Sequence, residues 1–480
     1  MNYSSPKFAL LFVVTFALFS MARATANRFW ILLLSSLLFY GWAGPIDLAI
    51  FLLVVIVSWS TSWLSCRHPA RRRSFIALGI AIMAAHLCIW KYLPWVVAQL
   101  QTAWPGFLQG KNLRLPLPIG ISFFTLQGIA YMVDLSRGKA KFMTFSKYLL
   151  FKSFFAQLIA GPIVRSHQLM PQLQQLRRPM IDDIALGLPL FVIGFGKKIL
   201  IADRVAPWVD TVFSHPGEWT RMSLTIGLLS YAVQIWADFS GYTDMGRGCA
   251  RMLGIRLPEN FLSPYLARTP SEFWKRWHIT LSDWIKDYIY IPLGGSQGTR
   301  WRTFGVVVLT MSLSGLWHGA NWTFVLWGLY HGMLLALERN TSLRWTRLTG
   351  RALDAVRYIL TLPAILFGWL LFRSANLTDL AIFVHGLIYG YGAKALGGHA
   401  LSDAGLGFIA CVGLHVILYR DLKQKHLIFF ARAEEGLSGK ISPRWASAAG
   451  LCAGAAIACL FVAGLIGRPP QPRPFIYFQF

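Results

Sequence analysis

Two histidines lie in the parts of this sequence that are best placed to carry out chemistry. His318 stands in the motif GLWHGANW, residues 315–322, between the apolar runs Phe304–Leu313 and Trp322–Leu337. A titratable imidazole at membrane depth is costly to keep and marks a functional site by default. The second histidine, His278, lies upstream in a polar stretch among apolar segments. We treat the two segments as one site.

The chemistry open to these histidines is general acid–base catalysis. A histidine near neutral pKa can take a proton from a hydroxyl and return one to a leaving group, which acyl transfer requires. No Gly-x-Ser-x-Gly motif and no nearby cysteine supplies a nucleophile, so direct transfer fits better than an acyl-enzyme. Gly315 and Gly319 would let an acyl chain or cofactor approach the backbone, or would serve helix packing.

The composition places these residues in a membrane protein. Of the 480 residues 55% are hydrophobic and only 14% are charged, which excludes an ordinary soluble enzyme. The net charge of +26 could indicate nucleic acid, but the basic residues cluster in short loops between apolar runs, as the positive-inside rule requires. We expect no nucleic-acid partner. The six cysteines show no CxxC spacing and are interpreted as core residues.

Apolar stretches of spanning length predict an all-α polytopic protein with about 11–12 transmembrane helices. Basic loops placed in the cytoplasm put the N-terminus outside. No fixed repeat or long linker divides the chain, so 1–480 is predicted to be a single domain. The expected spans are 8–21, 28–42, 46–64, 75–98, 115–133, 184–201, 222–243, 303–317, 322–338, 354–372, 405–419 and 446–466.

Two further apolar segments are predicted not to cross. Basic residues flank Tyr148–Val164 on both sides, and Leu380–Tyr391 must not cross if the loop Arg420–Arg444 is cytoplasmic. Re-entrant or interfacial pieces at membrane depth need shelter from protein or a water-filled cavity. We therefore expect a central cavity.

The stretch Ser271–Ile291 shows helical periodicity. Its aromatic and aliphatic residues recur at steps of three and four, with charged residues opposite, which predicts one amphipathic helix. His278 follows Trp274 by four residues and should share its face. The alternative is an interfacial helix whose histidine only snorkels.

Other titratable residues rank lower. His331 follows His318 by 13 residues, roughly 20 Å along a continuous helix and on a different face, so we do not expect the two to share a site. Their spacing matches no zinc motif, and no metal is expected. Asp238 and Asp244 could form a metal site, but hydrogen-bonded helix termination is favoured.

Several motifs in order resemble the membrane-bound O-acyltransferase family, and more narrowly the bacterial branch with the membrane subunit of alginate O-acetylation. The resemblance runs nearly end to end. One departure is that Lys275 and Lys286 stand where the branch more often has arginine. The motifs are Pro118–Phe123, Ala160–Pro162, Asp238–Tyr242, Pro258–Phe261, Phe273–Ile279, Asp287–Gly295, Gly315–Ala320 and Phe475–Phe480.

The resemblance implies roles for individual residues. His318 stands at the family's catalytic histidine, His278 at a second histidine of the branch, and Asn260 at a substrate or structural contact. It also implies a ring of spans around a thin core, where a cytoplasmic thioester meets an acceptor on the other side. Residues of the same motifs expected to support the site are Trp274, Arg276, Trp317 and Asp238.

The leading hypothesis is therefore an O-acyltransferase of the bacterial inner membrane that exports acetyl groups to an exopolysaccharide resembling alginate. Acetyl-CoA is the expected donor, without a permanently bound cofactor, and a periplasmic acetyltransferase is the expected protein partner beside membrane lipid. The alternative is a transporter or flippase of a polysaccharide or a lipid-linked intermediate, although no internal repeat supports it. The sequence does not identify the acceptor.

Overall fold

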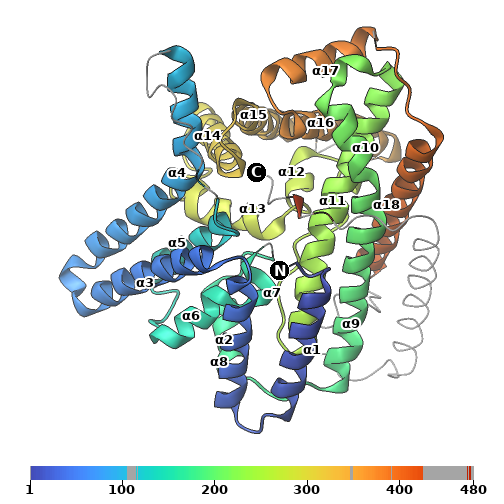
Figure 1. Cartoon of the computed structure of the whole chain (residues 1–480). Helices are drawn as coiled ribbons and strands as arrows, with labels where there is room; N and C mark the ends of the chain where they lie inside the picture. The colour runs from blue at the N-terminus through green and yellow to red at the C-terminus, as the bar shows by residue number, and fades with distance from the viewer. Residues whose placement is uncertain are drawn as a thin grey trace. The chain divides into compact units, whose positions relative to one another are not determined.

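The computed structural model describes residues 2–104, 115, 117–159, 161–345, 350–390, 392–424, 473, 475 and 476. Helices account for nearly all regular structure in these residues (Figure 1), which confirms the predicted all-α class. Five described helical segments are long and apolar enough to cross a membrane, as a multi-pass protein requires. They are Pro45–Arg67, Pro69–Ala103, Ile181–Ser214, Ala352–Arg373 and Gly398–Ile417.

The predicted spans before residue 420 all overlap described helices. The predicted span 446–466, the side chains of the loop Arg420–Arg444 and the motif residues Ala160 and Tyr477–Phe480 lie outside the described residues. The number of spans and the sidedness of the loops stay predictions.

The helices form two compact units, and the first comprises Met1–Leu188 with Gly246–Pro258. Its core contains a cluster of rings from Tyr3, Phe8, Phe39 and Phe155. Its helices are α1 (Pro6–Met21), α2 (Thr25–Gly41), α3 (Pro45–Arg67), α4 (Arg72–Ala103), α5 (Ile121–Ser136), α6 (Phe145–Ser153), α7 (Phe155–Leu158), α8 (Ser166–Gln174) and the first half of α9 (Ile181–Gly196).

The second unit comprises Pro189–Met245 with Glu259–Phe480 and contains both candidate histidines. Its helices include two π-helical segments: Lys197–Ala202 joins α9 to α10, and Lys286–Tyr290 continues from the end of α13. The helices are the end of α9, α10 (Asp203–Ser214), most of α11 (Arg221–Met252), α12 (Pro270–Trp274), α13 (Ile279–Ile285), α14 (Arg300–His318), α15 (Trp322–Trp345), α16 (Arg351–Arg373), α17 (Leu377–Tyr389) and α18 (Gly398–Gln424).

Local signals in the sequence set several helix starts. Pro6, Pro45 and Pro270 occupy first positions, where the missing N–H costs nothing. The side chains of Thr299 and Asn376 accept backbone N–H groups at the starts of α14 and α17.

The segments predicted not to cross form short helices. The region 148–164 is divided between α6, with nine residues, and α7, with four. At 1.5 Å per residue α6 is about 14 Å long, roughly half of a bilayer's hydrocarbon core. The 13 residues of α17 span about 20 Å, which is also too short. Both lengths agree with the prediction.

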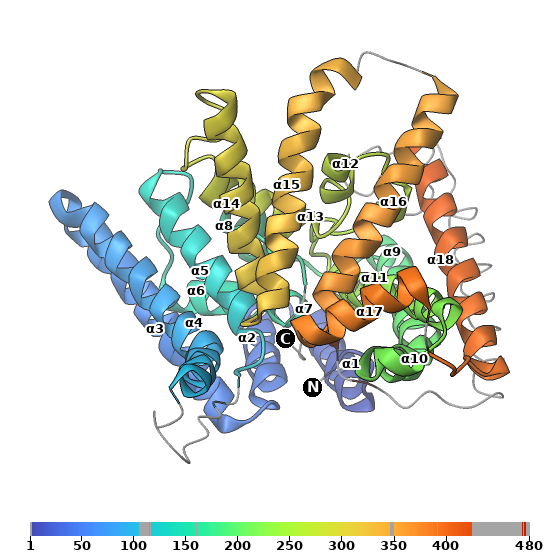
Figure 2. The same cartoon turned by 90° about the horizontal axis from the view of Figure 1, so that it is seen from above.

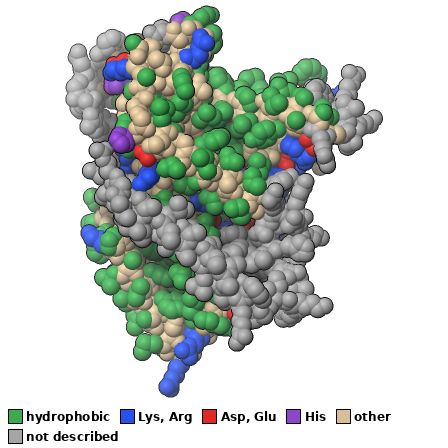
Figure 3. Space-filling view, turned by 90° about the vertical axis from the view of Figure 1, so that its right-hand side faces the viewer, with side chains coloured by type: hydrophobic (Ala, Val, Ile, Leu, Met, Phe, Trp, Pro, Cys, Tyr) green, Lys and Arg blue, Asp and Glu red, His purple; other side chains and the backbone are tan. Residues whose placement is uncertain are grey.

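Hydrophobic side chains are spread widely over the described surface on the face drawn in Figure 3, with few charged groups among them. Exposed hydrophobic residues of α18 include Leu406, Phe408 and Ile409, which are 51–70% exposed. Such wide apolar exposure suits contact with lipid.

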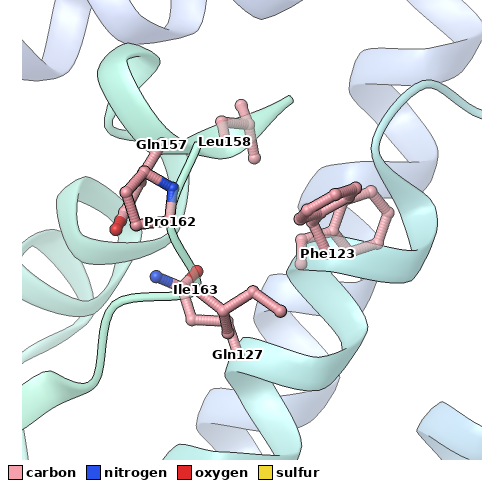
Figure 4. A pocket seen from close by; sticks show the side chains of 7 residues that line it. Phe123, Gln127, Gln157, Leu158, Pro162 and Ile163 are labelled. Atoms are coloured by element: carbon pink, nitrogen blue, oxygen red, sulfur yellow. The ribbon is translucent and has the colours of Figure 1, made fainter. Parts of the chain in front are cut away.

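A small pocket in the first unit lies between α5 and the segment after α7 (Figure 4). Its volume is ≈ 10 Å³, about the least that holds one water. Gln127 and Gln157 line it, and both donate to the carbonyl oxygen of Phe151. It contains no residue of the predicted site, and the expected central cavity stays a prediction.

Glycines bring α14 and α15 into backbone contact, and the two helices lie side by side in Figure 2. A Cβ at Gly315 would lie 2.3 Å from the carbonyl oxygen of Phe324, and one at Gly328 would lie 2.5 Å from that of Met311. At Gly319 a Cβ would meet the ring of Phe324 at 2.2 Å. Of the two alternatives for the motif glycines, the structure supports helix packing.

Gly328→Ala should therefore destabilise the protein. The added methyl has no room against the Met311 carbonyl, and overpacking of this kind costs about 1–3 kcal/mol. Thermal unfolding in detergent, followed by circular dichroism, should show a lower melting temperature. Gly305→Ala on α14 is the control, because its Cβ would meet nothing within 4 Å. Equal melting temperatures for the two variants would contradict the packing argument.

Candidate functional site

His278 lies at a break between two helices. The side chain of Thr269 caps α12, which ends at Trp274, and α13 begins only at Ile279. Between them His278 adopts φ 43° and ψ 54°, the left-handed region that side chains with a Cβ rarely occupy. Among the described residues only Ser263 shares this feature outside glycine. Backbone of this kind clusters at functional sites.

This break corrects the prediction of one amphipathic helix over Ser271–Ile291. Periodicity continues through the sequence, but the chain changes direction at His278. Trp274 and His278 therefore do not share a face. The Trp274 ring packs on Trp327 and His331, whereas the His278 ring packs on Phe239.

Asn260 holds the break in place from 18 residues upstream of His278. Its backbone carbonyl accepts the N–H of Ile279 at 3.0 Å. Its side-chain Oδ1 accepts the backbone N–H of Thr280 at 3.2 Å and the Thr280 hydroxyl at 2.9 Å. Asn260 thus takes the role of an N-cap for α13, satisfying donors that the helix itself leaves open.

The same oxygen fixes the tautomer of His278. Oδ1 of Asn260 lies 3.1 Å from Nδ1 of His278. Because a backbone N–H can only donate, the bond from Thr280 identifies the amide oxygen and makes Nδ1 of His278 the donor. Burial lowers the pKa of His278 to about 3, so the imidazole is neutral near pH 7. Nε2 is therefore its basic nitrogen.

His318 ends α14 and is enclosed by aromatic rings. Only 5% of the residue is exposed. Its ring meets Trp317, Trp327 and Phe372 edge-on, with centroids 4.8, 4.9 and 5.0 Å away. These contacts surround the imidazole with apolar rings, so that an approaching charge or proton is poorly screened.

His331 lies closer to His318 than the sequence predicted. The expected 20 Å assumed one continuous helix, but the chain turns at residues 319–321 between α14 and α15. The ring of Trp327 contacts His318 and His331, each with centroids 4.9 Å apart. The predicted separation of roughly 20 Å is therefore wrong, whereas the prediction that the two histidines serve different sites stays a prediction.

Ring contacts also connect the two candidate histidines within the second unit. His278 stacks on Phe261 at 6.3 Å, and His318 meets Phe372 at 5.0 Å. Both imidazoles belong to one aromatic cluster. The rings between them are Phe261, Trp277, Trp369 and Phe372, with successive centroids 5.0, 4.6 and 5.9 Å apart.

The predicted supporting residues take different positions. Trp274 and Trp317 belong to the aromatic cluster. Arg276 pairs with Glu272 at 2.6 Å. Although burial would raise the pKa of Glu272, the Arg268 backbone N–H and the Arg276 guanidinium outweigh it and lower that pKa.

Asp238 and Asp244 lie inside α11, which continues to Met252, so the expected helix termination is wrong. Each carboxylate pairs with a lysine: Asp244 with Lys197 at 2.7 Å and Asp238 with Lys198 at 2.8 Å. The sequence prediction overlooked these lysines. Their place in the apolar run 184–201 was a usable signal, because ionisable groups at membrane depth are rarely incidental.

Comparisons with known proteins agree with the resemblance. A profile described as MBOAT, membrane-bound O-acyltransferase family, matches residues 133–378. A probable alginate O-acetylase of Azotobacter vinelandii is 36% identical over 82% of this chain and 79% of its own. One from Pseudomonas putida is 34% identical over 100% of both chains. A peptidoglycan O-acetyltransferase of Helicobacter pylori is 35% identical over 66% of this chain and 65% of its own.

Asn260→Ala should destabilise the second unit, because three donors lose their acceptor. A buried donor without a partner costs about 1–3 kcal/mol. The melting temperature in detergent should fall clearly below that of Thr280→Val, which removes only the hydroxyl donor. If Asn260→Ala unfolds no earlier than Thr280→Val, Asn260 does not hold the break.

Proposed function

Because the chain belongs to the membrane-bound O-acyltransferase family, we propose that it moves acetyl groups from cytoplasmic acetyl-CoA across the inner membrane to hydroxyls of an exopolysaccharide resembling alginate. The chain is a multi-pass O-acyltransferase, which sets aside the transporter alternative. The observation that carries the finer proposal is the match to probable alginate O-acetylases over most of both chains.

The reaction needs a base and a proton donor in a dry site. A hydroxyl oxygen of the acceptor attacks the thioester carbonyl as its proton passes to an imidazole. The ester C–O bond forms, the C–S bond breaks, and the imidazolium returns the proton to the thiolate. The products are the acetyl ester and free CoA thiol, so atoms and charges balance.

We assign the general base to His318. Its aromatic enclosure supports this role, since exclusion of water strengthens the pull of the imidazole on a hydroxyl proton and limits hydrolysis of the thioester. His278 positions the donor or acceptor. The bond from Nδ1 to Asn260 supports that assignment, because it fixes the ring and directs Nε2 as an acceptor.

The names of the similar proteins guide the choice of the acceptor polysaccharide. Their names include alginate O-acetylases, a peptidoglycan O-acetyltransferase and teichoic acid D-alanyltransferases, and the alginate type matches over more of the chain. We further propose a periplasmic acetyltransferase partner, which would be the immediate acceptor in this scheme and would pass the acetyl group on to the polysaccharide. No permanently bound cofactor takes part in the scheme.

Replacing His318 tests the proposal. Purified protein in vesicles, given acetyl-CoA and alginate oligosaccharides, should form acetyl esters and release free CoA thiol. His318→Ala should lower kcat by about 10²–10⁴-fold, the usual worth of a general base. His318→Gln should be equally inactive, because an amide cannot shuttle a proton near neutral pH. His278→Asn should impair transfer without necessarily abolishing it.

His399→Ala serves as the matched control, because His399 is exposed in the same unit. It should turn over normally. Near-normal turnover by His318→Ala would refute the base assignment. Full activity in His318→Gln with none in His278→Asn would reverse the two roles.

A further inference from the structure

Lys197 and Lys198 lie close to α11 because the backbones of α9 and α11 approach each other closely. Gly194 and Gly241 pack so tightly that a Cβ on either would lie 2.5–2.6 Å from the other's carbonyl oxygen. Immediately after this contact the π-helical segment Lys197–Ala202 begins. Both lysines can therefore bond to carboxylates on α11. Such π-helical segments frequently mark functional positions.

Lys198 lies between two buried carboxylates. Its Nζ is 2.8 Å from Oδ1 of Asp203 and 2.8 Å from Oδ1 of Asp238. All three side chains are at most 3% exposed. Charges this deep are tolerated only when paired, and one ammonium here serves two acids.

Both carboxylates also hold a distant piece of chain. Asp238 Oδ2 accepts the N–H of Ile476 at 2.7 Å, and Asp203 accepts the backbone N–H of Arg473. The Arg473 guanidinium pairs with Asp210. We call Arg473, Phe475 and Ile476 the anchored segment.

The anchored segment leads to the candidate site. Phe475 and Ile476 are 0% and 3% exposed. The Phe475 ring packs on Tyr242 at 4.5 Å and on Phe239 at 5.5 Å. Phe239 in turn meets the His278 ring edge-on at 4.7 Å. A displacement of Phe475 would therefore loosen the packing of Phe239 against the His278 ring.

We propose that Lys198 is a positioning residue: by pairing with both Asp203 and Asp238 it keeps the anchored segment bound, and Phe475 then holds Phe239 against His278. Without the ammonium, two adjacent carboxylates would repel each other and draw in water. Their bonds to the backbone of the anchored segment would be lost with that hydration. The effect on acetyl transfer rests on the function proposed above, whereas the binding of the anchored segment does not.

The test measures two quantities separately. The labelling rate at position 476 reports whether the anchored segment stays bound, and kcat reports turnover. Ile476→Cys is placed in full-length protein whose six native cysteines are replaced by serine. Labelling by a maleimide in detergent should be slow, because position 476 is buried. Adding Lys198→Met should speed labelling by at least about tenfold through local opening. Lys198→Met alone should lower kcat by about 10–100-fold, with KM for acetyl-CoA little changed, as expected when catalytic groups are misplaced.

Lys197→Met is the matched control. Lys197 neighbours Lys198 and is also buried, but its carboxylate, Asp244, makes a different pair from the two that hold the anchored segment. Lys197→Met should leave position 476 slow to label. Lys198→Arg, which keeps the charge, should restore protection and most of kcat. If Lys198→Met is not recovered as a monodisperse protein, Lys198→Gln, which is polar but uncharged, also leaves the two carboxylates without an ammonium and should show the same release.

Continued protection of position 476 without Lys198, or equal labelling in Lys197→Met, would overturn the proposal. Release of the segment with unchanged kcat would refute its positioning role. Because labelling needs no activity, failure of the proposed function would leave the labelling result intact.

Discussion

The Asn260 side-chain oxygen is the contact on which the site depends. One acceptor serves the backbone N–H of Thr280, its hydroxyl and Nδ1 of His278. It therefore starts α13, sustains a left-handed residue and selects the neutral tautomer of an imidazole. A hydrophobic surrounding makes this contact decisive, because water cannot replace a lost acceptor there.

Around this contact, aromatic rings surround the histidine side chains, which in a soluble active site would be surrounded partly by water. Trp327 contacts His318 and His331, and Trp277 belongs to the ring series near His278. Edge-on contacts fix the imidazoles in orientation without supplying competing hydrogen bonds. Glycine contacts between α14 and α15 bring the backbones together so that His318, at the end of α14, meets the rings of α15. Packing and chemistry thus depend on the same few positions.

Hydropathy and charge placed the helices well, because burial in lipid demands long apolar runs whatever the tertiary contacts. The same reasoning predicted that the segments 148–164 and 380–391 do not cross, and the short helices α6, α7 and α17 found there agree with it. It failed at His278, where helical periodicity continues but the helix is broken by a cap from Asn260, 18 residues upstream. It also failed for His331, since a turn of three residues folds α15 back on α14. Long-range partners of this kind leave no trace in a local sequence pattern. Lys197 and Lys198, however, lie in an apolar run, and this position could have indicated their buried ion pairs.

The state of the His278 ring tests the account most directly. NMR of the ring nitrogens in protein carrying labelled histidine, assigned by comparison with His278→Gln, reports which nitrogen bears the proton. We predict a protonated Nδ1 and an unprotonated Nε2 throughout the range between about pH 5 and pH 8, in which an ordinary histidine titrates. A proton on Nε2, or titration of this ring near neutral pH, would contradict the role assigned to Asn260.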